Sequence, residues 1–157
     1  RWEECIFVLK GFQILLPVGI LYWLIKQKKV SDWDIRIRQE RYKILPIFMV
    51  STLIAMILIY FYGNSLFFNV YPILWFVALL GVIVTYFWKI SLHTMLNVAA
   101  TILVNFLFNW QLPILYIFIP IIGLARYYHK HHTILQVVIG AILSGLITFG
   151  MLKYFGY

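Results

Sequence analysis

Three of the four histidines of this chain lie within four positions, at His129, His131 and His132. Arg126 precedes the last of them by six residues, and Gln136 follows it by four. An arginine guanidinium is a permanently charged fork suited to phosphate oxygens, and an imidazole can exchange protons near neutral pH. Polar groups of this kind are costly at membrane depth, so their position between two long apolar segments predicts a functional site.

Two further polar clusters interrupt the apolar sequence. Ser91 and His93 follow one apolar segment, whereas Arg38 and Arg41 lie one helical turn apart in the long basic segment 26–43. Arginines bind phosphate through paired, charge-assisted hydrogen bonds, and a histidine can donate a proton to a leaving oxygen. Together with Arg126, these residues have the chemistry needed to bind and cleave a phosphate ester.

The elements that must position these residues follow from composition. The chain is 64% hydrophobic and only 11% charged, whereas soluble domains carry roughly 25% charged residues. Six apolar segments approach the roughly 20 residues that cross a bilayer as a helix. They are 5–25, 44–62, 66–88, 94–108, 112–128 and 133–155. We therefore expect an all-α fold, a six-transmembrane-helix bundle, forming one integral-membrane domain over residues 1–157.

Counting these segments places the three polar clusters on one face of the membrane. Segments 26–43, 89–93 and 126–132 follow the first, third and fifth apolar segments, respectively. The opposite turns, 63–65 and 109–111, contain no charged residue. Polar groups that converge from three loops at the mouth of a helix bundle are typical of a binding site.

The sixth apolar segment also has a packing signal. Gly140 and Ser144, and likewise Ala141 and Gly145, are four residues apart. Small residues at this spacing let membrane helices approach closely. We expect this stripe to have a structural role.

The spacing around His132 resembles a motif of a known family. Arg126, five residues, His132, three residues and Gln136 resemble the third signature of the type 2 phosphatidic acid phosphatase superfamily, Ser-Arg-x5-His-x3-Asp. Ala125 stands at the serine position and Gln136 at the aspartate position. An amide at that position can orient an imidazole by hydrogen bonding but supplies no charge.

The other two clusters resemble the remaining motifs of that family, in the same order. Ser91 and His93 occupy the serine and histidine positions of Pro-Ser-Gly-His. In the family's Lys-x6-Arg-Pro motif, Arg41 occupies the arginine position, whereas Asp34 and Tyr42 stand at the lysine and proline positions. The order of the motifs and the apolar segments between them extend the resemblance over nearly the whole chain.

The resemblance implies an integral-membrane lipid phosphatase or pyrophosphatase that acts through a phosphohistidine. It implies His132 as the nucleophile, His93 as the acid for the leaving oxygen, and Gln136 as the residue that orients His132. The implied phosphate-binding residues are Arg126, Arg41, Arg38 and Ser91. Substrates of the phosphatidic acid, phosphatidylglycerophosphate or polyprenyl diphosphate type would fit, and no cofactor is expected.

Other interpretations stay open at this point. A catalytically degenerate relative could bind a lipid phosphate without turnover, as a transporter component or scaffold, and the losses at Asp34, Leu92 and Gln136 favour that alternative. We expect His129 and His131 to be solvated loop residues. Imidazoles also bind zinc, but this stretch contains no cysteine or carboxylate, so no metal site is expected.

Charge predicts the partners and the orientation. The expected partners are a phospholipid or polyprenyl-phosphate substrate and membrane lipids, with no nucleic acid. Of the thirteen basic residues, only Arg1, Lys10 and Lys153 lie on the face opposite the clusters. The positive-inside rule therefore favours a cytoplasmic site face in the plasma (inner) membrane. The family more often faces the outer side, so charge and resemblance favour opposite orientations.

Overall fold

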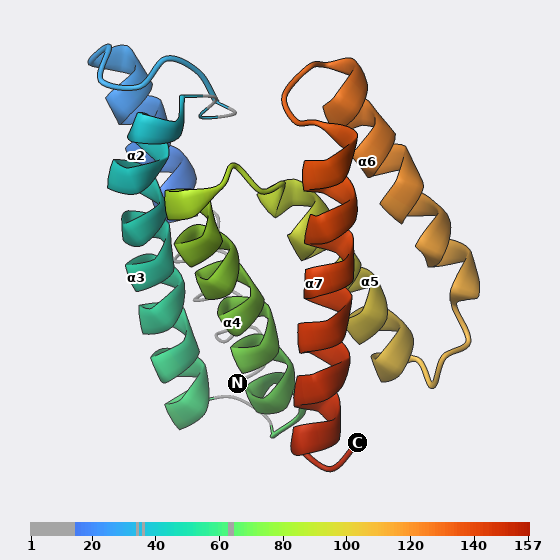
Figure 1. The fold of residues 1–157 in the computed structure, drawn as a ribbon. Helices are drawn as coiled ribbons and strands as arrows, with labels where there is room; N and C mark the ends of the chain where they lie inside the picture. The colour runs from blue at the N-terminus through green and yellow to red at the C-terminus, as the bar shows by residue number, and fades with distance from the viewer. Residues whose placement is uncertain (1–14, 34, 36, 63–64) are drawn as a thin grey trace. The chain divides into compact units, whose positions relative to one another are not determined.

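The computed structural model describes residues 15–33, 35, 37–62 and 65–157, and this part of the chain is helical without strands. The elements are α2 (Leu16–Lys26), α3 (Arg38–Tyr62), α4 (Ser65–Phe87), α5 (Leu92–Leu107), the 3-10 helix η2 (Pro113–Ile117), α6 (Phe118–Tyr128) and α7 (Ile134–Tyr154), drawn in Figure 1. The expected all-α fold is confirmed for this part. The chain divides into two compact units, residues 1–75 and 76–157.

Three helical segments are long and apolar enough to cross a membrane. They are Gln39–Leu58, Val70–Phe87 and Ile134–Tyr154, and three shorter apolar segments cover Leu16–Lys26, Leu92–Leu107 and Pro113–Tyr128. Three of the six expected segments thus contain helices that are long and apolar enough to cross a membrane. The first expected segment, 5–25, begins in residues that lie outside the described part.

Two of the expected boundaries are corrected. Helix α3 begins at Arg38, six residues before the expected apolar segment, because the polar residues ahead of that segment are mostly good helix formers. The fifth segment starts as a 3-10 helix with Pro113 in its first turn, where a missing backbone N–H costs nothing. Pro120 is the third residue of α6, which follows η2 without a break.

In the first unit, the segment after α2 folds back against the start of α3. Val30 and Ile35 are buried with Leu21 and Ile44 in one apolar cluster. The Glu40 carboxylate accepts hydrogen bonds from the backbone N–H of Ser31, at 3.1 Å, and from its hydroxyl, at 3.0 Å. These contacts hold the polar segment against the first turn of α3.

In the second unit, α5 and α7 pack side by side and run in the same direction. A Cβ built on Gly140 would meet the carbonyl oxygen of Ser91 at 3.4 Å. One turn further along both helices, the Ser144 hydroxyl donates to the carbonyl of Met95 at 2.6 Å. The expected packing role of Gly140 and Ser144 is therefore confirmed, because both residues lie at the contact between the two helices.

The polarity of α7 is that of a helix in lipid. Ser144 and Thr148 are fully buried, whereas Leu146 is 69% exposed and Ile142 57% exposed. A helix in water buries its aliphatic side chains, but in a bilayer the lipid replaces the core and small polar residues mediate helix contacts. This distribution is typical of a helix whose outer side faces lipid.

Candidate functional site

The α6–α7 connection brings Arg126 and His132 together through the backbone. Helix α6 ends at Tyr128, and Lys130, two residues later, has φ 55°, the left-handed conformation that follows many helices. The His131 N–H donates to the Arg126 carbonyl at 3.1 Å, and the Lys130 N–H donates to the Tyr127 carbonyl at 2.9 Å. This pair of bonds is a Schellman motif. The His132 N–H also donates to the Arg126 carbonyl, at 3.4 Å, so the two predicted site residues are fixed to each other.

The side chain of His132 is held by the first turn of α7. It is buried, with 6% of its surface exposed, although it belongs to a loop. Its Nδ1 lies 3.3 Å from Oε1 of Gln136, the contact that their spacing of four residues predicts. The same Oε1 accepts the backbone N–H of Thr133 at 3.1 Å, while the Thr133 hydroxyl accepts the Gln136 N–H at 3.3 Å. Thr133 and Gln136 thus form a capping box.

The capping box determines which nitrogen of His132 carries the proton. The Thr133 N–H can only donate, so the atom it contacts is the carbonyl oxygen of the Gln136 amide and not its nitrogen. That oxygen has no proton, and Nδ1 of His132 must therefore be the donor in the second bond. In a neutral imidazole this leaves the lone pair on Nε2, on the opposite edge of the ring from Gln136. With the proton on Nδ1, Nε2 is the ring nitrogen with the chemistry of a nucleophile or base.

The start of α7 has fewer available backbone N–H groups than the start of an uncapped helix. The first backbone N–H groups of a helix lack intrahelical acceptors and attract anions. Here the capping box uses the N–H groups of Thr133 and Gln136, which leaves those of Ile134 and Leu135. Arg126, half-buried in the last turn of α6, carries a full positive charge six residues before His132 in the sequence.

The second cluster, Ser91 and His93, lies at the start of α5, beside a part of α7 that is well removed from His132. Ser91 is fully buried and caps α5: its hydroxyl oxygen accepts the Thr94 N–H at 3.4 Å and lies 2.9 Å from the Thr94 hydroxyl. The packing of Ser91 on Gly140 sets the start of α5 roughly two helical turns, about 12 Å, from the His132 end of α7. His93 lies in the first turn of α5 and is exposed. The structure thus brings the Gln136 side chain and the Arg126 backbone to His132, but it sets Ser91 about two helical turns away.

The predicted arginines of the first cluster belong to the first unit. Arg41 is buried, with 6% exposure, and its Nε donates to the Ile35 carbonyl at 2.8 Å. It therefore helps to hold the segment before α3. Arg38 is the first residue of α3, and its side chain, like residue Asp34, lies outside the described part. The phosphate-binding roles of both arginines stay predictions.

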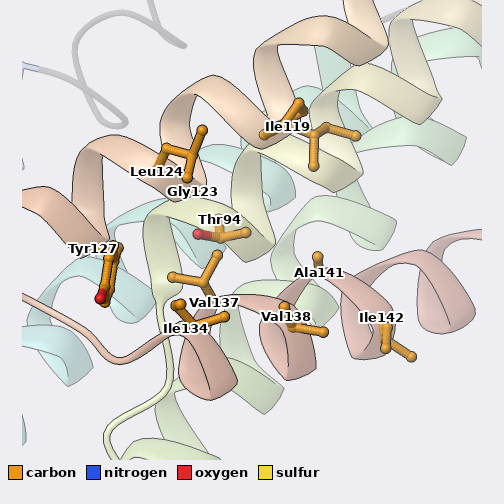
Figure 2. A pocket seen from close by; sticks show the side chains of 11 residues that line it. Thr94, Ile119, Gly123, Leu124, Tyr127, Ile134, Val137, Val138, Ala141 and Ile142 are labelled. Carbon is orange, nitrogen blue, oxygen red and sulfur yellow. The ribbon is translucent and has the colours of Figure 1, made fainter.

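A groove begins next to this site, between α6 and α7. Its volume is about 360 Å³ and its walls are almost entirely aliphatic, as Figure 2 shows. Tyr127, adjacent to Arg126, and Ile134, two residues after His132, line one end of it. The buried Thr94 contributes from α5, with its hydroxyl already bonded to Ser91. The remaining lining residues are Ile119, Pro120, Gly123, Leu124, Val137, Val138, Ala141 and Ile142.

The histidines that precede His132 form a separate pair. The rings of His129 and His131 have centroids 5.9 Å apart, and His129 is exposed. Among the residues that the structure describes, no three or more His, Cys, Asp or Glu side chains are grouped so that they could hold a metal ion.

Two residues of the site were not expected from the sequence. Thr133 fixes the amide that contacts His132, and its Thr-x-x-Gln pattern is a readable capping-box signal. Lys130 makes the tight reversal, but the usual glycine or asparagine signal is absent there.

Comparison with protein-family models, with curated proteins and with solved structures finds no match.

Proposed function

We propose that this protein is an integral-membrane lipid phosphatase or pyrophosphatase in which His132 attacks the phosphorus. The observation that carries the proposal is the hydrogen bond between Nδ1 of His132 and Gln136, whose oxygen also accepts the Thr133 N–H. It directs the lone pair to Nε2 and holds the ring still. A nucleophilic imidazole requires both the correct tautomer and a fixed orientation, and here Gln136 is the group that orients the ring.

The reaction has two displacements at phosphorus. Nε2 of His132 forms a bond to phosphorus while the bond from phosphorus to the lipid oxygen breaks, and that oxygen takes up a proton. Water then attacks the phosphohistidine, releasing inorganic phosphate and restoring the imidazole. Arg126 and the first N–H groups of α7 would stabilise the charge on the phosphoryl oxygens in both steps. No metal ion is needed for either step in this proposal.

The resemblance to the type 2 phosphatidic acid phosphatase superfamily implies His93 as the proton donor. The start of α5 lies about two turns of α7 away from His132, so direct donation needs α5 to shift or a water to relay the proton. The resemblance also implies phosphate-binding roles for Arg38, Arg41 and Ser91. We further propose that all six apolar segments cross the membrane, so that the three clusters share one face.

Phosphate release from purified protein tests the function. A panel of phosphatidic acid, phosphatidylglycerophosphate and polyprenyl diphosphate in mixed micelles should yield inorganic phosphate for at least one lipid. His132→Ala should reduce that release to a few per cent or less of the wild-type rate, whereas His129→Ala, in the same connection, should retain it. Release by His132→Ala at the wild-type rate would refute the nucleophile. Lipid binding without release in the wild-type protein would favour the alternative of a degenerate lipid-phosphate binder.

We propose a cytoplasmic site face in the plasma membrane, because the basic residues concentrate on that face. Gln27 is exposed in the basic segment after α2. A cysteine at Gln27, in a Cys5→Ser background, should resist an impermeant thiol reagent in intact cells and react after lysis. Reaction in intact cells would reverse the orientation.

A further inference from the structure

The connection between α5 and η2 holds a tryptophan in an unfavourable backbone conformation. Asn109 and Trp110 have positive φ angles of 51° and 61°, and the Gln111 N–H donates to the Phe108 carbonyl at 3.1 Å. The two central positions of such a turn favour asparagine and glycine, because a large side chain in the left-handed region clashes with the backbone. Trp110 is therefore strained, and strain of this kind clusters at functional positions.

Asn105 of α5 fixes the strained turn from inside the second unit. The residue is fully buried. Its backbone carbonyl accepts the Trp110 N–H at 2.6 Å, and its side-chain Oδ1 accepts the Leu112 N–H at 3.2 Å. Its amide nitrogen donates to the Thr101 carbonyl, also at 3.2 Å. One buried side chain thus ties the turn to α5 and keeps Trp110 in its strained conformation.

The ring of Trp110 belongs to an aromatic cluster with Phe106, Phe149 and Tyr157. It stacks on Phe149 with ring centroids 5.9 Å apart and planes 12° apart. Phe106 contacts Trp110 and Tyr157 edge-on, with centroids 6.4 Å and 4.8 Å apart. These contacts do not bury the cluster, since Trp110 is 47% exposed and Tyr157 is 52% exposed. The strained turn therefore displays an aromatic surface instead of adding a ring to the core.

The aromatic cluster and the candidate site lie at opposite ends of α7 (Figure 1). Phe149 follows Thr133, the N-cap of α7, by sixteen residues, or about 24 Å of helix. Lys153, the single charged residue of α7, follows Thr133 by twenty residues, or about 30 Å. The hydrocarbon core of a bilayer is about 30 Å thick. The length of α7 therefore matches one cluster-to-site crossing of that core.

Tryptophan and tyrosine prefer the boundary between hydrocarbon and headgroups. There the ring enters the acyl chains while the indole N–H or the phenol hydroxyl reaches polar groups and water. We infer that the aromatic cluster binds this boundary in the leaflet opposite the candidate site, and that Trp110 anchors α5 and α7 at that depth. The α6–α7 connection then lies at the other boundary, in contact with water, and not near the bilayer centre. This placement in the membrane holds whether or not the protein is a phosphatase.

Spin-label depths along α7 test the placement. Single cysteines at Leu135, Ile142 and Gly150, in a Cys5→Ser background, carry a nitroxide in phosphatidylcholine nanodiscs. Leu135 and Ile142 are exposed, and a Cβ at Gly150 meets nothing within 4 Å. Power saturation with oxygen and with a nickel chelate should place the Ile142 label deepest and both other labels about 10 Å nearer to a surface. A Leu135 label as deep as the Ile142 label would put the candidate site inside the hydrocarbon and overturn the inference.

Two substitutions of Trp110 test the anchor itself. Trp110→Tyr keeps an aromatic ring with a polar atom, whereas Trp110→Leu keeps an apolar side chain without one. The Gly150 label should move toward the bilayer centre by at least about 3 Å, the rise of two helical residues, in Trp110→Leu and should keep its depth in Trp110→Tyr. Tyr157→Leu should move it in the same direction and is the second variant if Trp110→Leu fails to fold, because Tyr157 lies beyond the end of α7. An unchanged Gly150 depth in the folded leucine variants would overturn the anchor.

Discussion

Substitutions of Gln136 can distinguish the effect of its two hydrogen bonds from the effect of a negative charge, such as that of the aspartate at this position in the motif that the sequence resembles. Gln136→Leu keeps the approximate volume but removes the oxygen that accepts from both Thr133 and His132. Gln136→Glu keeps an oxygen at the same reach and adds a negative charge 3.3 Å from Nδ1. The pair therefore tests whether geometry or charge at this position supports catalysis.

The expected magnitude follows from the bond that is lost. At 3.3 Å the His132–Gln136 bond is long, so its net value is about 0.5–1 kcal/mol. This bond favours the tautomer with the proton on Nδ1, which is the tautomer that can attack through Nε2. Losing the bond reduces the population of that tautomer by a factor of about two to five. A ring that is no longer held in line loses more, up to about a hundredfold. We expect Gln136→Leu to lower kcat between about tenfold and a hundredfold.

The glutamate variant has a different signature. Its carboxylate favours the protonated, non-nucleophilic imidazole by charge attraction. The acidic limb of the kcat/KM profile should therefore move to higher pH, by about one unit, while the rate on the alkaline side stays close to wild type. A negative charge in the first turn of α7 also suits the helix dipole, so Gln136→Glu should not lower the melting temperature.

The assay is phosphate release from a lipid phosphate in mixed micelles between about pH 5 and 9, with melting temperature measured for each variant. Thr133→Val is the matched control, because it removes the N-cap oxygen but leaves Oε1 of Gln136. It should cost about 1 kcal/mol of stability with a smaller loss of kcat than Gln136→Leu. A Gln136→Leu variant with wild-type kcat and an unchanged pH profile would refute the role assigned to this contact.

Two further predictions concern the acid and the metal. His93→Gln should slow phosphate release from an alkyl phosphate at least tenfold. It should leave release from a nitrophenyl phosphate, whose leaving group needs no proton, almost unaffected. If the substitution changed the rates on the two substrates by the same factor, His93 would not be the proton donor. Activity should survive chelation by EDTA, since Arg126 supplies the positive charge at the phosphate. A loss that zinc reverses would instead assign a metal to the pair His129 and His131.

The parts of the site that could be predicted from the sequence are those set by helical periodicity. The spacing of His132 and Gln136 predicts their contact, and the structure has it. The expected segment 133–155 agrees with α7, Ile134–Tyr154, to within a residue at each end. Gly140 and Ser144 pack against α5 as their spacing predicts. In each case the signal is local, because it depends on residues within one helix.

The parts that could not be predicted depend on tertiary placement. Nothing in the sequence around Lys130 indicates the left-handed residue that closes α6. The register of α5 against α7, which sets Ser91 at Gly140, depends on packing between segments about fifty positions apart. The groove likewise requires the approach of Gly123 to Val137, and a lone glycine in an apolar segment does not reveal its partner. Motif order predicts a shared face but not the distances on it.

The most direct test of the central claim is to trap the covalent intermediate. Protein mixed with a radiolabelled lipid phosphate and quenched in alkali within one turnover should carry a label that is stable to base and labile to acid, as a phosphohistidine is. Peptide mass spectrometry should place it on His132, and His132→Ala should carry none. Phosphate on another residue, or turnover with no label on the protein at any quench time, would contradict the mechanism.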